Sequence, residues 1–342
     1  MASLVLVTGA SGFIGSHIVA QLLAAGHHVR ATVRNPANAK SVGFLEDLPG
    51  SDNLQIVQAD LNSEGAFDDH VKGVDFIIHC ASPYVLNVQD AQRDLVDPAV
   101  RGTLSVLAAA AKSPGIKRVV LTSSMAAVTD EPDGRLLTEN DWNTRSSLTR
   151  NPYYFSKAEA ERAAWQFMKD HEPRFDLVVI NPFMVIGPSL APTINTSNQI
   201  LLDIANGTYP AIMALEWGFV DVRDVAQAHI LAMTAETAKG RYLCAAENRT
   251  MRDVAGLLRQ TPINTDKLAR IDLAGPIGTR IMKLAASLQP AGIRSYLKTH
   301  LGRRPRFDNS KIRRDLGIEF RNVDTSLQEA AADLVKWGHA RA

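Results

Sequence analysis

The sequence predicts an α/β fold, in which a doubly wound parallel sheet is joined to a smaller, mostly helical region. Short apolar runs alternate with helical patterns through the first two-thirds of the chain, a glycine-rich turn follows the first run, and the pattern changes after Gly187. Nearly continuous apolar runs are typical of strands that helices cover on both faces. Their alternation with helices favours a parallel sheet.

The expected elements follow in chain order. Strands are expected at residues 4–8, 29–33, 55–58, 76–79, 118–122 and 177–181, and the clearest helices at residues 15–25, 93–111 and 152–170. A helix over 222–234 and a strand over 241–245 come later, and the last helix covers 326–337. We therefore assign residues 1–187 and 219–245 to a nucleotide-binding domain, and residues 188–218 and 246–342 to a substrate-binding region.

Composition excludes several classes of protein. The chain has 342 residues, of which 46% are hydrophobic and 21% charged, and its net charge is +1. Such a balance predicts no long-range attraction to nucleic acid or anionic lipid, and no run approaches the ~20 apolar residues that span a bilayer. Two cysteines, Cys80 and Cys244, suit neither a disulfide framework nor a metal site. With no visible signal peptide, we expect a cytoplasmic monomer or homodimer without metal, nucleic-acid or membrane partners.

A glycine-rich turn joins the first expected strand to the first helix. Glycine permits positive φ and a close backbone approach, and a helix N-terminus offers free N–H groups to a pyrophosphate. The context of a strand followed by a helix is the one that a dinucleotide-binding motif requires. The residues expected to contact the cofactor here are Gly9, Ser11, Gly12, Phe13, Ile14 and Gly15.

The end of the second strand bears on the choice of nicotinamide cofactor. An acidic residue there would bind the adenosine ribose 2′-OH, but the chain has Arg34, with Lys40 further on. A guanidinium can hold a 2′-phosphate through two parallel hydrogen bonds. The pattern therefore predicts NADP(H), with an exposed surface charge as the alternative for Arg34. Arg30 lies on the other face of the strand and is expected to be structural.

Tyr153 and Lys157 form the candidate reactive pair. They are four residues apart in an expected helix, so they share a face about one turn apart. A phenol has a pKa near 10, and a neighbouring ammonium lowers it by favouring the phenolate. Tyr154 is a rival proton donor, but it would point about 100° away from this face. The run Thr122-Ser123-Ser124 ends the fifth strand and offers two serines that could bind a substrate oxygen.

The turn, which has the form Thr-Gly-x-x-Gly-x-x-Gly, resembles that of the extended short-chain dehydrogenase/reductase superfamily, whose sheet is of the Rossmann type. Five further segments resemble the group of dihydroflavonol reductases, cinnamoyl-CoA reductases and yeast-type carbonyl reductases. They are VRATVR at 29–34, PAVRGTLSVLAAA at 98–110, LTENDW at 137–142, INPFMVIGP at 180–188 and FVDVRDVAQAH at 219–229.

The resemblance implies roles for individual residues. It implies reduction of a carbonyl to an alcohol by NADPH with a triad of Ser124, Tyr153 and Lys157, and it favours Ser124 over Ser123. It implies that Lys157 also binds the nicotinamide ribose. The further residues that it places against the cofactor are Asp60, Leu61, Ala81, Ser82, Thr122, Pro182 and Phe183.

Departures from the plant enzymes bear on the substrate. Thr129 stands where the flavonoid reductases have an asparagine, and residues 148–152 lack the Asn-Trp-Tyr-Cys-Tyr run of the cinnamoyl-CoA reductases. The departures favour a microbial reductase of broad range. An apolar pocket is expected, as ligand sites tend to be, which favours a hydrophobic aldehyde, ketone or keto ester. Its candidate lining residues are Tyr84, Val85, Met125, Met213 and Trp217, together with Phe183, and packing in the core is the alternative for each.

Two other functions compete with the reductase. One is an NAD-dependent nucleotide-sugar epimerase or dehydratase with the same triad, which Arg34 and the apolar pocket oppose. The other is a non-catalytic protein that senses NADP(H), which the Tyr153–Lys157 pair opposes. The sequence leaves the direction of the reaction and the stereochemistry of the product open.

Overall fold

A computed structural model describes residues 2–82, 88–289 and 291–342. Its central feature is a parallel sheet of seven strands in the order β10-β7-β5-β4-β1-β2-β3. The strands are β1 (Leu4–Thr8), β2 (His28–Val33), β3 (Leu54–Gln58), β4 (Phe76–His79), β5 (Arg118–Thr122), β7 (Asp176–Pro182) and β10 (Gly240–Cys244). This order, with the crossover beside β1, is that of a doubly wound Rossmann-type sheet, so the predicted fold class is confirmed.

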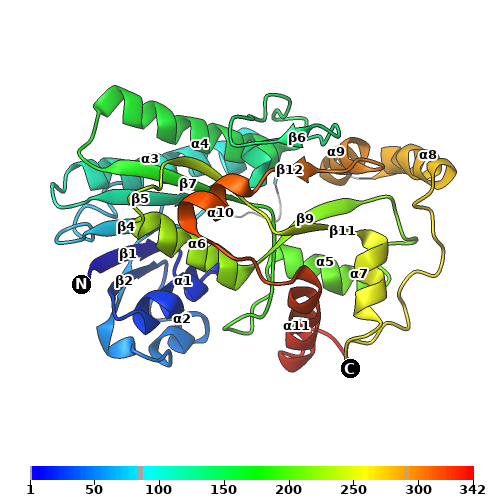
Figure 1. Cartoon of the computed structure of the whole chain (residues 1–342), viewed down its shortest axis with the longest axis horizontal. Helices are drawn as coiled ribbons and strands as arrows, with labels where there is room; N and C mark the ends of the chain where they lie inside the picture. The colour runs from blue at the N-terminus through cyan, green and yellow to red at the C-terminus, as the bar shows by residue number, and fades with distance from the viewer. Residues whose placement is uncertain (1, 83–87, 290) are drawn as a thin grey trace.

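Helices cover both faces of the sheet (Figure 1). On one face lie α3 (Asp97–Ala111) and α4 (Pro152–His171), and on the other α1 (Phe13–Ala24), α2 (Ala39–Glu46) and α6 (Val222–Thr234). Alternate residues of β1 enter the two cores: Val5 and Val7 join the core beneath α1 and α6, and Leu6 joins the core beneath α3 and α4. Burial on both faces explains why the strands are continuous apolar runs.

A second core lies beside the carboxyl ends of the strands. Its helices are α5 (Thr196–Ala205), α7 (Met251–Leu258), α8 (Pro276–Ala285), α9 (Ala291–His300) and α11 (Val323–Lys336), whereas α10 (Ser310–Leu316) packs on the main core through Ile312 and Leu316. A sheet in the order β11-β9-β8 connects them, formed by β8 (Met184–Ile186), β9 (Glu216–Asp221) and β11 (Glu247–Thr250). A short pair, β6 (Leu136–Leu137) and β12 (Arg306–Phe307), returns the C-terminal part to the main domain. The sequence analysis did not expect these five short strands.

The long helix expected over 93–111 is divided. Residues Gln92–Val96 form a π-helical segment, and α3 starts at Asp97 with Pro98 in its first turn. Proline has no N–H to donate and its ring crowds the carbonyl four residues earlier, so a regular helix cannot run through this position. The helix over 222–234 is observed with the bounds that the sequence predicts.

Candidate active site and cofactor site

The glycine turn is packed too tightly for side chains. Gly9 has a φ of 66°, and a Cβ built on it would lie 2.8 Å from the backbone N of Ala81. A Cβ on Gly15 would lie 2.2 Å from the carbonyl oxygen of Gly9. Helix α1 starts after Gly12 without a side-chain cap and has no acidic residue in its first turn. Its N-terminus therefore keeps backbone N–H groups and a partial positive charge available for an anion, which fits a dinucleotide pyrophosphate.

Replacing Gly15 by Ala should disrupt this turn. The new methyl group would collide with the Gly9 carbonyl, which must move together with the loop that approaches the cofactor. We expect the Kd for NADPH, measured by fluorescence titration, to rise at least about tenfold, a free-energy loss of about 1.4 kcal/mol. The matched control is Gly256→Ala, because Gly256 lies within helix α7 with nothing near its Cβ position. An unchanged Kd in the Gly15 variant would contradict this role for the turn.

Buried polar groups hold the end of β4 beside the turn. Thr8 Oγ1 lies 2.6 Å from His79 Nδ1 and accepts a hydrogen bond from the backbone N of Ala81 at 3.1 Å. Burial lowers the pKa of His79 to about 3, so this imidazole is neutral near pH 7. Ser82 Oγ in turn accepts a hydrogen bond from Lys157 Nζ at 2.7 Å. The loop after β4 thus connects the glycine turn to the candidate reactive helix.

Arg34 and Arg30 occupy different environments, but not because they lie on two faces of the strand, since residues four apart in a strand share a face and Arg34 comes after the end of β2. Arg34 is exposed at the end of β2, and within the described residues its guanidinium forms no hydrogen bond or ion pair. Arg30 donates to Gln55 Oε1 and to the carbonyl oxygens of His70 and Lys72, so its predicted structural role is confirmed. Arg34 is therefore the guanidinium that remains available to a ligand at this edge of the sheet.

Three more predicted cofactor residues lie at or near the same edge. Lys40 is in the first turn of α2, although its side chain lies outside the described part of the structure. Asp60 is half-buried after β3, where its Oδ1 accepts from the backbone N of Asn62. Leu61 packs against Gly102 of α3.

The Tyr153–Lys157 pair is formed as the spacing predicts. Lys157 Nζ lies 5.8 Å from the centre of the Tyr153 ring, and Tyr153 is 40% exposed at the start of α4. Desolvation lowers the pKa of Lys157 to about 8, so its ammonium form still predominates at neutral pH. The rival Tyr154 is directed to His300, with its hydroxyl 3.5 Å from Nε2, and burial raises its pKa well above the usual value. Of the two tyrosines, Tyr153 is therefore the exposed one beside Lys157.

The two serines after β5 have different partners. Ser123 is buried, and its hydroxyl donates to Glu161 Oε2 at 2.6 Å. Ser124 is half-buried, and its Oγ accepts only the backbone N–H of Ala126, at 3.2 Å, among the described residues. Ser124 thus keeps its hydroxyl proton for a ligand, while Ser123 is committed to the core.

The sequence analysis missed a buried ionic network directly behind these serines. Arg241 Nε lies 2.5 Å from Glu161 Oε1, and Asn181 Nδ2 donates both to Glu161 Oε2 and to the carbonyl oxygen of Ser124. Glu161 is one helical turn after Lys157, so its position on the inner face of the helix was the available signal. The network fixes the backbone of Ser123 and Ser124 relative to helix α4.

Thr122, at the end of β5, is fixed by two neighbours. Its Oγ1 lies 2.8 Å from His229 Nε2 and 3.1 Å from Cys80 Sγ. Burial lowers the pKa of His229 to about 4 and raises that of the Cys80 thiol to about 12. Both groups are therefore uncharged near pH 7, and Thr122 is held among neutral partners.

The predicted pocket residues are divided between the turn after β5 and the second core. Met125 is half-buried in the turn after Ser124, whereas Met213 and Trp217 are buried, Trp217 with its Nε1 donating to the Tyr296 hydroxyl at 2.7 Å. Pro182 is the buried last residue of β7, and Phe183, which follows it, is 7% exposed with its ring 4.8 Å from that of Phe307. Tyr84 and Val85 lie outside the described residues.

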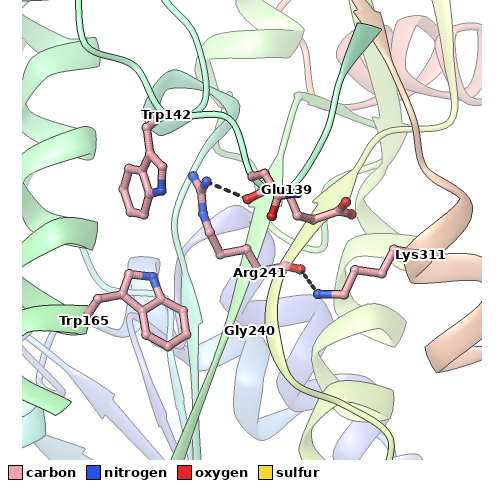
Figure 2. A pocket seen from close by; sticks show the side chains of 7 residues that line it. Glu139, Trp142, Trp165, Gly240, Arg241 and Lys311 are labelled. Atoms are coloured by element: carbon pink, nitrogen blue, oxygen red, sulfur yellow. Dashed lines mark hydrogen bonds between the residues drawn. The ribbon is translucent and has the colours of Figure 1, made fainter. Parts of the chain in front are cut away.

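One pocket of about 350 Å³ lies elsewhere, at the start of β10 (Figure 2). Lys311 Nζ donates to the carbonyl oxygens of Lys239 and Arg241, and Glu139 Oε1 accepts from the backbone N of Leu243. None of the predicted site residues lines it, and its charged side chains already have protein partners. Its lining residues are Glu139, Asn140, Trp142, Trp165, Gly240, Arg241 and Lys311.

The described residues contain neither a candidate metal site nor a candidate membrane-spanning helix. No group of three or more His, Cys, Asp or Glu side chains is placed to hold a metal ion. No helix in the described part of the chain is long and apolar enough to cross a membrane.

Comparison with known proteins decides the family. Residues 5–245, from β1 to the end of β10, match the model of the NAD dependent epimerase/dehydratase family. The chain belongs to this family. Within the family, it is 44% identical to the cinnamoyl-CoA reductase CAD2 of Medicago truncatula over 272 residues, which cover 76% of this chain and 81% of that protein. It is 41% identical to tetraketide alpha-pyrone reductase 2 of Arabidopsis thaliana over 263 residues, 74% and 81% of the two chains.

A solved structure of another family member matches almost the whole chain. Gre2 of Candida albicans, in complex with NADPH, is 32% identical and superimposes with a TM-score of 0.81 over 98% of this chain and 99% of that one. The resemblance to the reductase group is thereby confirmed. The similarity to Gre2 also includes the C-terminal part of this chain, which the family model does not match.

Proposed function

We propose that this protein uses NADPH to reduce a hydrophobic aldehyde, ketone or keto ester to the alcohol, with Tyr153 as the proton donor. The observation that carries the proposal is the Tyr153–Lys157 pair, whose lysine bonds to Ser82 in the loop packed against the glycine turn. Ser124, which keeps its hydroxyl proton, supports it. The cinnamoyl-CoA reductase relative and the Gre2–NADPH structure support the same chemistry.

Each residue of the triad has a distinct task in the proposed mechanism. The Ser124 hydroxyl donates a hydrogen bond to the carbonyl oxygen of the substrate and holds it beside Tyr153. Tyr153 transfers its proton to that oxygen as negative charge develops on it, and the ammonium of Lys157 stabilises the resulting phenolate. The bound nicotinamide supplies the hydride to the carbonyl carbon. Positioning and stabilisation of the oxyanion account for most of the rate.

The test is the consumption of NADPH, and separately of NADH, with aromatic aldehydes, aliphatic ketones, β-keto esters and dihydroflavonols. We expect oxidation of NADPH to be much faster than that of NADH with at least one hydrophobic carbonyl compound. If neither cofactor is consumed, the reductase proposal fails. Purification with tightly bound NAD would instead support the epimerase or dehydratase alternative.

Arg34 should set the preference for NADPH. Replacing it by Ala removes the guanidinium that faces solvent at the end of β2, so we expect KM for NADPH to rise about tenfold or more while KM for NADH changes little. The control is Arg259→Ala, another exposed arginine, which should alter neither value. Equal losses with both cofactors would show that Arg34 acts on the fold rather than on a 2′-phosphate.

The rate of reduction should fall at alkaline pH. Because desolvation has already lowered the pKa of Lys157 to about 8, its ammonium is lost as the pH rises through that value. Its loss removes the positive charge that favours the phenolate formed when Tyr153 gives up its proton. We expect kcat for reduction to be level below pH 7 and to decline with an apparent pKa near 8. A profile that stays level to pH 10 would contradict this role of Lys157.

A further inference from the structure

Helix α8 carries apolar residues on two separate faces. Its inner face is formed by Gly278, Met282 and, in the turn after the helix, Ala286, of which Met282 and Ala286 pack on the second core. Its outer face carries a stripe of large apolar side chains in contact with solvent. They are Ile277, Ile281, Leu284 and Leu288, exposed by 76%, 51%, 76% and 88%.

The spacing of the outer stripe is helical. Residues 277, 281 and 284 follow one another at intervals of four and three, so at about 100° per residue they fall within an arc of about 60° on α8, and Leu288 follows in the 3₁₀ turn Ala286–Leu288. A stripe of this width is what a helix ordinarily buries. Here the helix lies at one end of the long axis of the molecule (Figure 1), and the side chains of the stripe are exposed.

Positive charge accompanies this stripe. The sequence from 273 to 307 has no Asp or Glu, and its seven basic residues are Arg280, Lys283, Arg294, Lys298, Arg303, Arg304 and Arg306. Two of them pair with acids outside the segment, Arg303 with Glu131 and Arg304 with Glu216. The other five form no ion pair within the described residues. The net charge of +1 for the whole chain conceals this local excess, because the acids lie elsewhere.

Arg280 and Lys283 flank the stripe directly. Arg280 precedes Ile281 and Lys283 precedes Leu284, which places both basic residues on the same side of the apolar line, Arg280 exposed and Lys283 half-buried. Long basic side chains beside an apolar stripe can reach anionic headgroups while the apolar groups enter the acyl boundary. A partner for this face must therefore be apolar over one helix length and negatively charged beside it.

We propose that α8 docks this protein on an anionic lipid surface. A lipid surface offers apolar acyl chains beneath a layer of negatively charged headgroups. It needs no groove of matching shape, so it can accept a stripe that projects outward. The association is peripheral: the helix spans only Pro276–Ala285 and lies in the interface. The charged and the apolar parts act together, because neither a few lysines nor one short stripe holds a protein on a membrane strongly.

The experiment is co-sedimentation of the full chain with vesicles of phosphatidylcholine alone and of an equimolar mixture with phosphatidylglycerol, at low and high salt. We expect binding to the anionic vesicles that weakens with salt, and little binding to phosphatidylcholine. The double variant Ile281→Asp/Leu284→Asp should lower the partition coefficient by about tenfold or more, as should Arg280→Glu/Lys283→Glu. Circular dichroism and thermal melting check that each variant remains folded.

The controls match each change on another surface. Leu148→Asp alters an exposed apolar residue outside the segment, and Arg259→Glu/Lys267→Glu makes the same change of charge as the basic variant. Both should bind vesicles as the parent chain does. The proposal is overturned if no vesicle is bound, or if the controls lose binding equally. It is also overturned if sedimentation velocity shows a dimer that the α8 variants dissociate, because a second copy would then cover the stripe.

Discussion

Replacing Tyr153 by Phe should lower kcat for carbonyl reduction by a factor of about a thousand, because general acid catalysis contributes about 10²–10⁴ to such a rate. Phenylalanine keeps the ring that lies 5.8 Å from Lys157 Nζ and removes only the proton that the substrate oxygen receives. The Kd for NADPH should stay near that of the parent chain. Single-turnover kinetics with saturating cofactor would measure the chemical step.

The neighbouring tyrosine provides a matched control for that experiment. Tyr154→Phe removes a hydroxyl that faces His300 rather than Lys157, so kcat should change by less than about tenfold. If Tyr153→Phe retained near-normal turnover, the assignment of the proton donor would be wrong. If both variants lost activity equally, the loss would be due to a disturbed start of α4 rather than to the removal of one hydroxyl.

The second large effect concerns Glu161. Replacing it by Ala leaves the Arg241 guanidinium, which is 6% exposed, without its carboxylate partner. Breaking a buried ion pair from one side costs about 3–5 kcal/mol, because the remaining charge is neither solvated nor paired. Ser123 Oγ and Asn181 Nδ2 lose an acceptor at the same time. We expect the free energy of unfolding in urea to fall by that amount.

Glu159 gives the comparison for a surface pair on the same helix. Its partner Arg162 is 37% exposed and Glu159 itself is 34% exposed, so Glu159→Ala should cost about 0–1 kcal/mol. Replacing Arg241 by Met together with Glu161→Leu should recover part of the lost stability, because no charge is then left buried. A small effect of Glu161→Ala alone would show that water reaches Arg241.

The main sheet could be predicted from the sequence because most of its strands are buried on both faces, the edge strand β3 being the exception. Residues 4–8, 76–79 and 118–122 match the observed strands, and the other predicted strands of the sheet differ by one residue at one or both ends. The small sheet could not be predicted. Strand β8 has three residues, too few to establish a period, and β9 carries Gly218 because a Cβ there would lie 2.5 Å from the Phe183 ring. Contacts between distant segments determine these strands.

The candidate site, like the fold, could be predicted from the sequence only in part. Spacing within one helix was enough to pair Tyr153 with Lys157, and the turn at 9–15 follows directly from its strand. Sequence could not separate Ser123 from Ser124 by itself, because the difference between them is the carboxylate of Glu161, which comes 38 residues after Ser123. Nor could it show that Trp217 bonds to Tyr296, 79 residues later.

The edge strand β10 has a consequence for how copies of this protein can associate. Lys311 occupies the carbonyl oxygens of Lys239 and Arg241, and Glu139 occupies the N–H of Leu243. Another strand can pair with an open strand edge through such backbone groups. Side chains that already bond to these groups prevent that pairing. The sheet therefore ends at β10, because side chains already bond to the backbone groups that a further strand would need. Two copies cannot join their β10 edges into one continuous sheet unless Lys311 and Glu139 first withdraw.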